Sequence, residues 1–184
     1  MYLGKTCTRV SCKVHELVSS ETCSFKDYHW NVCIIYSQPE SLAIGCEDRR
    51  IYLLNQGDLN ELPCSVPFKD TIQALSFDRT EGKYLACLSD DNLLRIFTLD
   101  PVSGLESEPL LTFPLSSRGV SLCFHSFLTE HILIAEESGA IRFLNLCTQE
   151  WIFSVYEPMS NQSVPRLVSA DWNPIDPNLY VIYK

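Results

Sequence analysis

The 184-residue sequence contains no apolar run long enough to cross a bilayer, which takes about eighteen uninterrupted apolar residues. Its first twenty residues also lack the apolar centre of a secretory signal. Hydrophobic residues nevertheless make up 46% of the chain, which is enough for a packed core. We therefore expect a soluble, intracellular, globular protein with no transmembrane segment.

Positive charge is scarce. The chain has 14 basic and 23 acidic residues, a net charge of -9, and the basic residues are scattered singly apart from Arg49 and Arg50. Direct nucleic-acid binding needs a positive stripe that displaces counterions from phosphates. The sequence offers no such stripe, so we expect no direct contact with nucleic acid.

Closely spaced metal ligands are also missing. The nine cysteines are odd in number, no two are separated by two residues, and most lie in apolar runs such as "NVCIIY" and "YLACLS". Zinc sites use close pairs of ligands, and a disulfide framework needs an even count. We expect free thiols that pack as small apolar groups in a reducing compartment, and no metal.

Catalytic motifs are equally absent. The sequence has no Gly-rich phosphate loop and no Gly-x-Ser-x-Gly elbow. Asp90 and Asp91 are adjacent, so their side chains point in different directions, unlike a catalytic carboxylate pair. His125 could serve as a general base, but no positioned partner is indicated, and a loop histidine at a blade edge is the favoured interpretation. We predict no enzymatic activity, catalytic residue, cofactor or small-molecule substrate.

The sequence does contain a repeat. A segment with strand-like alternation ends in an aromatic residue at Tyr36, Phe77, Phe124 and Trp172, at intervals of 41, 47 and 48 residues. After it come a continuous apolar run, an acidic or glycine-bearing turn, an arginine-centred strand and a less regular fourth segment. Four strands in every 41 to 48 residues, without helical periodicity, are typical of a β-propeller blade of WD40 size.

The predicted fold is all-β: a single, incomplete WD40-like β-propeller over residues 1–184. It has about three complete four-stranded blades plus incomplete flanking blades of a seven-bladed ring. The expected blades are 1–27 (partial), 28–66, 68–114, 118–158 and 164–184 (partial). The strand count would also suffice for a closed four-bladed ring, the lower limit of the class. We favour the open arc, because a four-bladed ring demands different packing between blades.

The second complete blade carries candidate stabilising residues. WD40 blades typically join a turn aspartate, a second-strand serine or threonine, a third-strand tryptophan and a histidine in a buried hydrogen-bond chain. Phe97 stands where the tryptophan would be and has no N–H to donate, so the chain is expected to be shorter or to end in water. Arginine is predicted to recur at one position per blade, as Arg50, Arg95 and Arg142. We assign a structural, blade-stabilising role to Ser89, Asp90, Asp91, Arg95, Phe97, Arg142 and Trp172.

Four blocks in order resemble the small WD40-repeat nucleoporins of the 37-kilodalton class. They are "LACLSDDNLLRIFTL" (85–99), "SRGVSLCFH" (117–125), "ILIAEESGAIRFLNL" (132–146) and "VPRLVSADW" (164–172). The resemblance extends over roughly residues 68–174, and the first 67 residues fit more loosely. Because about three later blades are missing relative to that family, we expect a shortened product or fragment.

This resemblance implies a non-enzymatic scaffold in the outer-ring Y-complex of the nuclear pore, at the nuclear envelope. It implies other outer-ring nucleoporins as partners, especially the large propeller-plus-solenoid nucleoporin of a short arm, and a kinetochore association in mitosis. No short motif marks the partner interface, which stays unknown at this point. Two alternatives stay open: an adaptor that presents substrates to a ubiquitin ligase or a chromatin complex, and a hydrolase with its site at the central channel.

Overall fold

The described part of the chain is built of β-strands. The computed structural model describes residues 32–37, 41–46, 49–55, 58–63, 68–78, 80–100, 104–156, 169–173, 176 and 180–183. All of the regular elements in these ranges are strands, so the predicted all-β class is confirmed. None of the described residues forms a long apolar helix of the kind that spans a bilayer. The strands expected before residue 28 lie outside the described ranges.

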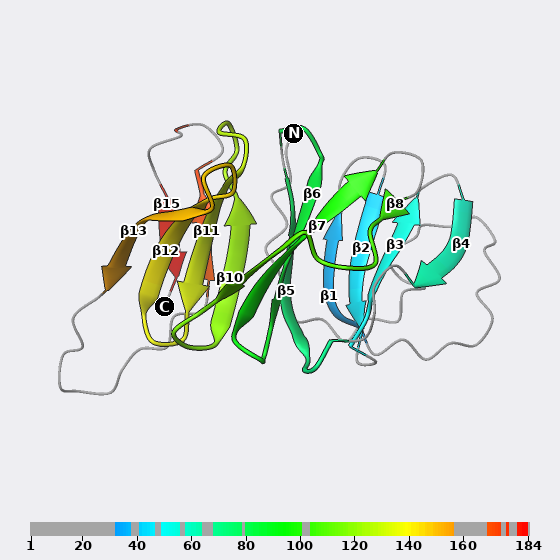
Figure 1. Ribbon diagram of the computed structural model, residues 1–184, viewed down its shortest axis with the longest axis horizontal. Coiled ribbons are helices and arrows are strands. Elements are labelled where there is room, and N and C mark those ends of the chain that lie inside the picture. The colour runs from blue at the N-terminus through cyan, green and yellow to red at the C-terminus, as the bar shows by residue number, and fades with distance from the viewer. Residues whose placement is uncertain are drawn as a thin grey trace.

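The strands form four antiparallel sheets that follow one another along the chain (Figure 1). The first sheet consists of β1 (Val32–Ser37), β2 (Ser41–Cys46), β3 (Ile51–Asn55) and β4 (Asp58–Pro63). The second consists of β5 (Ile72–Phe77), β6 (Tyr84–Ser89), β7 (Leu93–Asp100), β8 (Gly104–Leu105) and β9 (Leu111–Pro114). The third consists of β10 (Gly119–Phe124), β11 (His131–Glu136), β12 (Ala140–Asn145) and β13 (Glu150–Tyr156). The fourth pairs β14 (Ser169–Trp172) with β15 (Tyr180–Tyr183).

Strand order agrees with the sequence pattern. The apolar runs at 41–46 and 131–136 are β2 and β11, and the first-position segment at 119–124 is β10. Each is followed in its sheet by the next strand along the chain. The short strand β8 was not expected: it pairs with the far end of β7 through Leu99 and Leu105, before the chain returns to pair β9 with the near end.

The predicted arginine position needs one correction. In the second and third sheets, Arg95 and Arg142 pair with Cys87 and Ile134, the fourth residues of β6 and β11. The fourth residue of β2 pairs with Tyr52, so tyrosine occupies the matching place in the first sheet. Arg50 precedes β3 by one residue. The prediction that Arg50 shares the position was therefore wrong, because the pairing register of β2 and β3 gives this position to Tyr52.

Neighbouring sheets contact one another along their first strands. β1 contacts β5, β5 contacts β10, and β10 contacts β14. Figure 1 shows β1, β5 and β10 near the centre, with β2 to β4 further out on one side and β11 to β13 further out on the other. A first strand is held to its neighbour by polar contacts as well: Ser76 Oγ on β5 accepts the Phe124 N–H of β10 at 3.2 Å. This gives the wedge arrangement of propeller blades around an axis.

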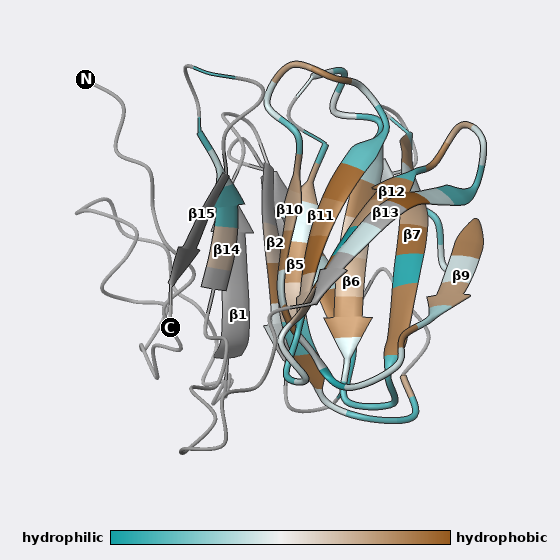
Figure 2. Ribbon diagram, turned by 90° about the vertical axis from the view of Figure 1, so that its left-hand side faces the viewer, coloured by the Kyte–Doolittle hydropathy of each residue, from teal (hydrophilic) through white to brown (hydrophobic). Residues whose placement is uncertain are grey.

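The second strands are buried on both faces, as their continuous apolar runs predict. Every residue of β6 is buried, and β11 is buried from Ile132 to Glu136. Figure 2 shows the hydrophobic colouring of these central strands. The alternation of β11 divides its side chains between two cores: Ile132 and Ile134 join the core of the first three sheets, and Leu133 joins that of the third and fourth.

Two glycines allow close approach between sheets. A Cβ at Gly45 in β2 would lie 2.9 Å from Cγ2 of Ile72 in β5. A Cβ at Gly119, which begins β10, would lie 2.9 Å from both terminal methyl carbons of Leu88 in β6. Both distances are shorter than van der Waals contact, so a side chain at either position would require the neighbouring side chain to shift.

The sheets have two distinct ends. We name the turn end after the β2–β3, β6–β7 and β11–β12 turns, together with the linkers that enter the first strands. We name the loop end after the opposite connections, which include residues 78, 80–83, 125–130 and 146–149. The polar site residues predicted for the second blade lie at the turn end.

Candidate functional site: the polar junctions of the blades

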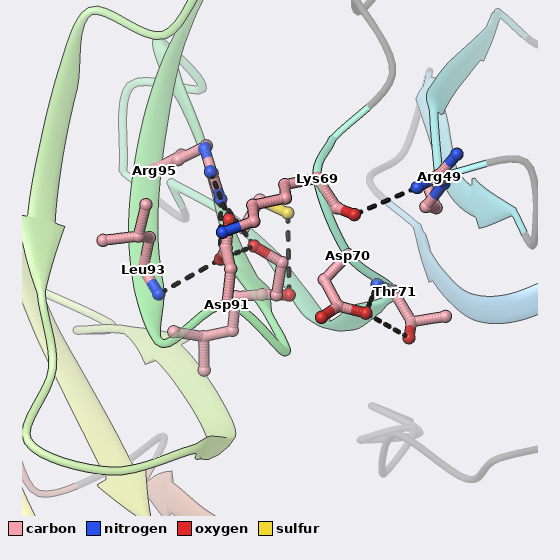
Figure 3. A network of polar contacts seen from close by, with 10 residues as sticks. Arg49, Lys69, Asp70, Thr71, Asp91, Leu93 and Arg95 are labelled. Carbon is pink, nitrogen blue, oxygen red and sulfur yellow. Dashed lines mark hydrogen bonds and ion pairs between the residues drawn. The ribbon is translucent and has the colours of Figure 1, made fainter.

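The β6–β7 turn brings together three of the predicted residues, Ser89, Asp91 and Arg95 (Figure 3). Arg95 Nη1 donates to the Ser89 hydroxyl at 2.5 Å, and Arg95 Nη2 lies 2.5 Å from Asp91 Oδ2. The Ser89 hydroxyl donates to Asp91 Oδ1 at 2.6 Å, and the Leu93 N–H donates to the same oxygen at 3.3 Å. These charge-assisted bonds fix the end of β6, the turn and β7 to one another.

The surroundings of Asp91 favour its ionised form. Burial alone would raise the pKa of this carboxyl, because a charged group loses hydration. The hydrogen bonds from Arg95 and Ser89, the positive charge of Arg95 and the Leu93 N–H outweigh that effect, so the pKa of Asp91 is lowered below its usual value. Asp91 is therefore a structural anion in its own blade.

Asp90 points away from this cluster and links the second sheet to the third. Its Oδ2 accepts from Thr71 Oγ1 at 3.0 Å and from Gln73 Nε2 at 2.7 Å. Its Oδ1 pairs with Nε of Arg118, which immediately precedes β10. The two adjacent aspartates thus have separate tasks: one joins strands within a blade, and the other joins one blade to the next.

Phe97 lies apart from the polar cluster. It is fully buried on β7 and meets the edge of the Phe68 ring, with 5.9 Å between the ring centroids. The Arg95 guanidinium lies over the Phe68 ring, 5.0 Å from its centroid. The polar cluster therefore reaches as far as Arg95. The contact of its guanidinium with the Phe68 ring then connects the cluster to the linker from the first sheet.

The third sheet has a comparable ion pair whose carboxylate comes from a strand. Arg142 Nε on β12 lies 2.5 Å from Glu136 Oε1 at the end of β11, and the Glu136 side chain is fully buried. Glu136 Oε2 accepts from the N–H and the hydroxyl of Ser117, at 2.8 and 3.1 Å. The Arg142 guanidinium lies 5.2 Å from the ring centroid of Trp151 on β13. Glu136 and Arg142 together hold three strands and the incoming linker.

Sequence reasoning missed Glu136 and Arg118. Glu136 is the last residue of β11, as Ser89 is the last residue of β6. In both sheets an arginine follows this strand end by six residues, and Glu136 takes the place of Ser89. That spacing is the signal in the sequence. Arg118 carries no comparable signal, because its partner lies in another sheet and depends on the packing of the blades.

A hydrogen-bond acceptor follows the first strand in three sheets. Asp78 accepts from the Thr80 N–H at 3.0 Å, and Asn173 accepts from the Asp176 N–H at 3.3 Å. His125 Nδ1 accepts from the N–H groups of Phe127 and Leu128 at 3.0 and 2.9 Å. The side chain in this position fastens the loop that leads to the second strand.

His125 also packs between sheets, which places the predicted residue Trp172. The His125 ring lies 4.3 Å from the Trp172 ring of β14, and Phe143 meets Trp172 at 5.2 Å. His125 is 2% exposed. This histidine is buried at the junction of the third and fourth sheets. Its Nδ1 caps the loop and its ring packs on an aromatic neighbour, which is a structural position.

The cysteines whose side chains the structure describes are free thiols. The described ranges contain no cluster of three or more potential metal ligands. Cys87 and Cys123 are buried free thiols, and burial raises the pKa of Cys87. Cys147 is a free thiol on the surface. Both buried cysteines pack as small apolar groups.

Solved structures define the class of protein. The chain matches the WD40 domain of Toxoplasma gondii coronin with a TM-score of 0.68 and 18% identity, over 80% of this chain and 39% of that one. It matches the WD40 repeats of RRP9 with a TM-score of 0.64 and 14% identity, over 79% and 43%. No protein-family model matches the chain. The fold is that of a WD40 β-propeller, of which the described sheets form a part.

Sequence comparison gives the particular likeness. The chain is 35% identical to human nucleoporin Nup37 over 123 residues, which are 67% of this chain and 34% of the relative. It is 34% identical to mouse Nup37 over the same length, and 36% identical to Drosophila melanogaster Nup37 over 92 residues, 50% and 26% of the two chains. The resemblance to the 37-kilodalton WD40 nucleoporins is confirmed. The chain spans about a third of the length of the mammalian relatives that it matches.

Proposed function

We propose that the protein is a non-enzymatic scaffold subunit of the nuclear pore complex, in the outer-ring Y-complex at the nuclear envelope. The observation that carries this proposal is the likeness to nucleoporin Nup37 in three animals. The polar groups of the junctions support it. Ser89, Asp91, Arg95 and Glu136 are engaged in bonds within the blades, which suits a rigid platform.

The proposed partners are other outer-ring nucleoporins, especially the large propeller-plus-solenoid nucleoporin of a short arm. Propeller loops and edges supply the binding surfaces, because the first strands of the sheets are used for packing between blades. In mitosis the same contacts would take the protein to kinetochores. No cofactor, direct nucleic-acid contact or small-molecule substrate is part of this function.

The test is affinity purification of the tagged, full chain from interphase extract, followed by mass spectrometry, with imaging of the tagged protein in the same cells. We expect outer-ring nucleoporins to co-purify and the fluorescence to follow the nuclear rim. Recovery of ubiquitin-ligase or histone subunits without nucleoporins would replace the proposal with the adaptor alternative. Diffuse fluorescence without any nucleoporin would contradict it as well.

A further inference from the structure

A long connection sets the second sheet apart from the third. In the third sheet, residues 146–149 lead from β12 to the outermost strand, β13. In the second sheet, residues 101–110 separate β7 from the outermost strand, β9, and the short strand β8 lies within them. The second blade therefore carries extra chain at its loop end, although the third sheet reaches its outermost strand without it.

We call the described part of this connection, residues 104–110, the β8 arm. Two main-chain hydrogen bonds fasten it to β7. The Glu106 N–H donates to the Thr98 carbonyl at 3.1 Å, and the Leu110 N–H donates to the Ile96 carbonyl at 2.7 Å. Because the arm is bonded to a core strand at two points, it has a fixed place in the fold.

Leu105 is the apolar anchor of the β8 arm. It is 7% exposed and belongs to the core shared by the first three sheets, whereas the three residues that follow it are exposed. Leu105 pairs with Leu99 of β7, which packs partly buried against the same core. The arm thus places one large apolar side chain inside the protein while the chain after it stays in water.

The β8 arm lies against the first sheet. A Cβ placed on Gly104 would be 3.9 Å from Cδ2 of Leu53, which lies on β3 and packs against the shared core. Figure 1 shows β8 close to β3. Gly104 has a φ of 82°, a conformation that glycine adopts without strain. The chain can therefore turn at this point and bring its backbone close to Leu53.

The first and second sheets are joined at two other places. Near the centre, β1 and β2 contact β5. At the turn end, the Phe68 N–H donates to the Arg49 carbonyl at 2.7 Å, and Arg49 Nη1 donates to the Lys69 carbonyl at 3.0 Å. The β8 arm adds a third contact, which comes from the loop end of the second sheet and meets the first sheet further out, at β3.

We propose that the β8 arm is a clasp that fastens the first sheet to the second. If the first sheet swings away from the second, β3 leaves the arm, and apolar surface of Leu53 and Leu105 is exposed to water, which opposes the motion. The clasp therefore lowers the population of states in which the first sheet alone has opened. The proposal concerns the connection between two sheets and is independent of the assembly in which the protein works.

Amide hydrogen exchange of the full chain tests the clasp, because it reports opening strand by strand. Leu105→Ala removes most of the anchor. We expect exchange at the β3 amides to become about tenfold faster relative to exchange at the β11 amides of the third sheet. Leu111→Ala is the matched control, since Leu111 lies on β9, which pairs with the same β7, and packs partly buried against the same core. It should leave the ratio of the two rates within about twofold of wild type.

A substitution on the first sheet checks that the coupling runs through this contact. Leu53→Ala should speed exchange of the Glu106 amide, which is bonded to the Thr98 carbonyl. Leu105→Val keeps most of the apolar volume and should give a smaller effect in the same direction, so it replaces Leu105→Ala if circular dichroism shows that the alanine variant is unfolded. The proposal is overturned if the β3 and β11 amides accelerate equally in the Leu105 variant, or if Leu111→Ala accelerates β3 as much. Unchanged exchange of the Glu106 amide in Leu53→Ala would overturn it as well.

Discussion

Arg118, which leads into the third sheet, forms an ion pair with Asp90 in the β6–β7 turn of the second sheet. The pair spans the boundary between two blades, while the neighbouring Asp91–Arg95 pair lies within one blade. A partly exposed pair such as Asp90–Arg118 is screened by water and contributes modestly. Its role is to set how one blade lies on the next.

The Asp90–Arg118 pair should show a small, salt-sensitive coupling. A double-mutant cycle with Asp90→Ala and Arg118→Ala, measured by urea unfolding, should give a coupling energy of about 0.5 to 1 kcal/mol at low salt. High salt should reduce it. The control cycle combines Asp90→Ala with Arg95→Ala, because these two residues belong to different ion pairs. It should give a smaller coupling energy.

The Asp91–Arg95 pair should make stability depend on acid. Because the folded-state pKa of Asp91 is lowered, its contribution to stability is complete above the unfolded pKa of about 3.9 and is lost as pH falls through the folded pKa. The difference in unfolding free energy between wild type and Asp91→Asn should therefore be largest above about pH 5 and shrink toward pH 2. Urea titrations across this range measure it. Glu108→Gln, at an exposed position, should show no comparable trend, and a constant difference for Asp91→Asn would contradict the prediction.

Removal of one partner from the buried Glu136–Arg142 pair should be severe. Glu136→Leu leaves the Arg142 guanidinium without its counter-ion and the Ser117 N–H without its acceptor, which should lower the unfolding free energy by about 3 kcal/mol or more. The double variant Glu136→Leu/Arg142→Leu should recover part of this loss, because two apolar side chains then replace two charges. Denaturant titration of both variants makes the comparison, and a double variant that is less stable than the single one would refute the explanation.

Gly45 and Gly119 should differ in their tolerance of alanine. At Gly45 the new methyl would meet Cγ2 and Cβ of Ile72, a buried β-branched side chain with a stiff χ1, so Gly45→Ala should cost about 1 to 3 kcal/mol. At Gly119 it would meet terminal methyl groups of Leu88, which can change rotamer, so the cost should be smaller. Thermal unfolding of the two variants gives the order. In an Ile72→Ala background, Gly45→Ala should cost less, because the closer contact with Cγ2 is removed and the 3.3 Å contact with Cβ stays.

The acceptor at position 125 should matter more than the imidazole ring. His125→Ala removes the acceptor of two part-buried N–H groups of the loop and should cost about 1 kcal/mol. His125→Asn keeps an acceptor, as Asn173 does in the fourth sheet, and should cost less. Hydrogen exchange at the Phe127 and Leu128 amides reports the loop directly. Equal exchange in the two variants would assign the effect to lost packing on Trp172 instead.

Much of the fold can be predicted from the sequence, because the pattern of each blade is local. Strand alternation and the aromatic residues at Phe77, Phe124 and Trp172 give the repeat without knowledge of pairing. The error at Arg50 arose where the register, rather than the letters, decides the position. The Asp90–Arg118 contact could not be predicted, because it depends on how two sheets are placed relative to one another.

Asp78, His125 and Asn173 place an acceptor atom at the same point after three first strands, with three different side-chain chemistries. The feature that must be kept after each first strand is an acceptor lone pair in the right place. Substitutions among dissimilar amino acids that supply it therefore leave the loop unchanged. Blades of one ancestral design can then drift apart in their letters while their backbones stay superposable. Recognition by residue identity fades before recognition by shape, and this chain has its shape in common with WD40 domains at 14 to 18% identity.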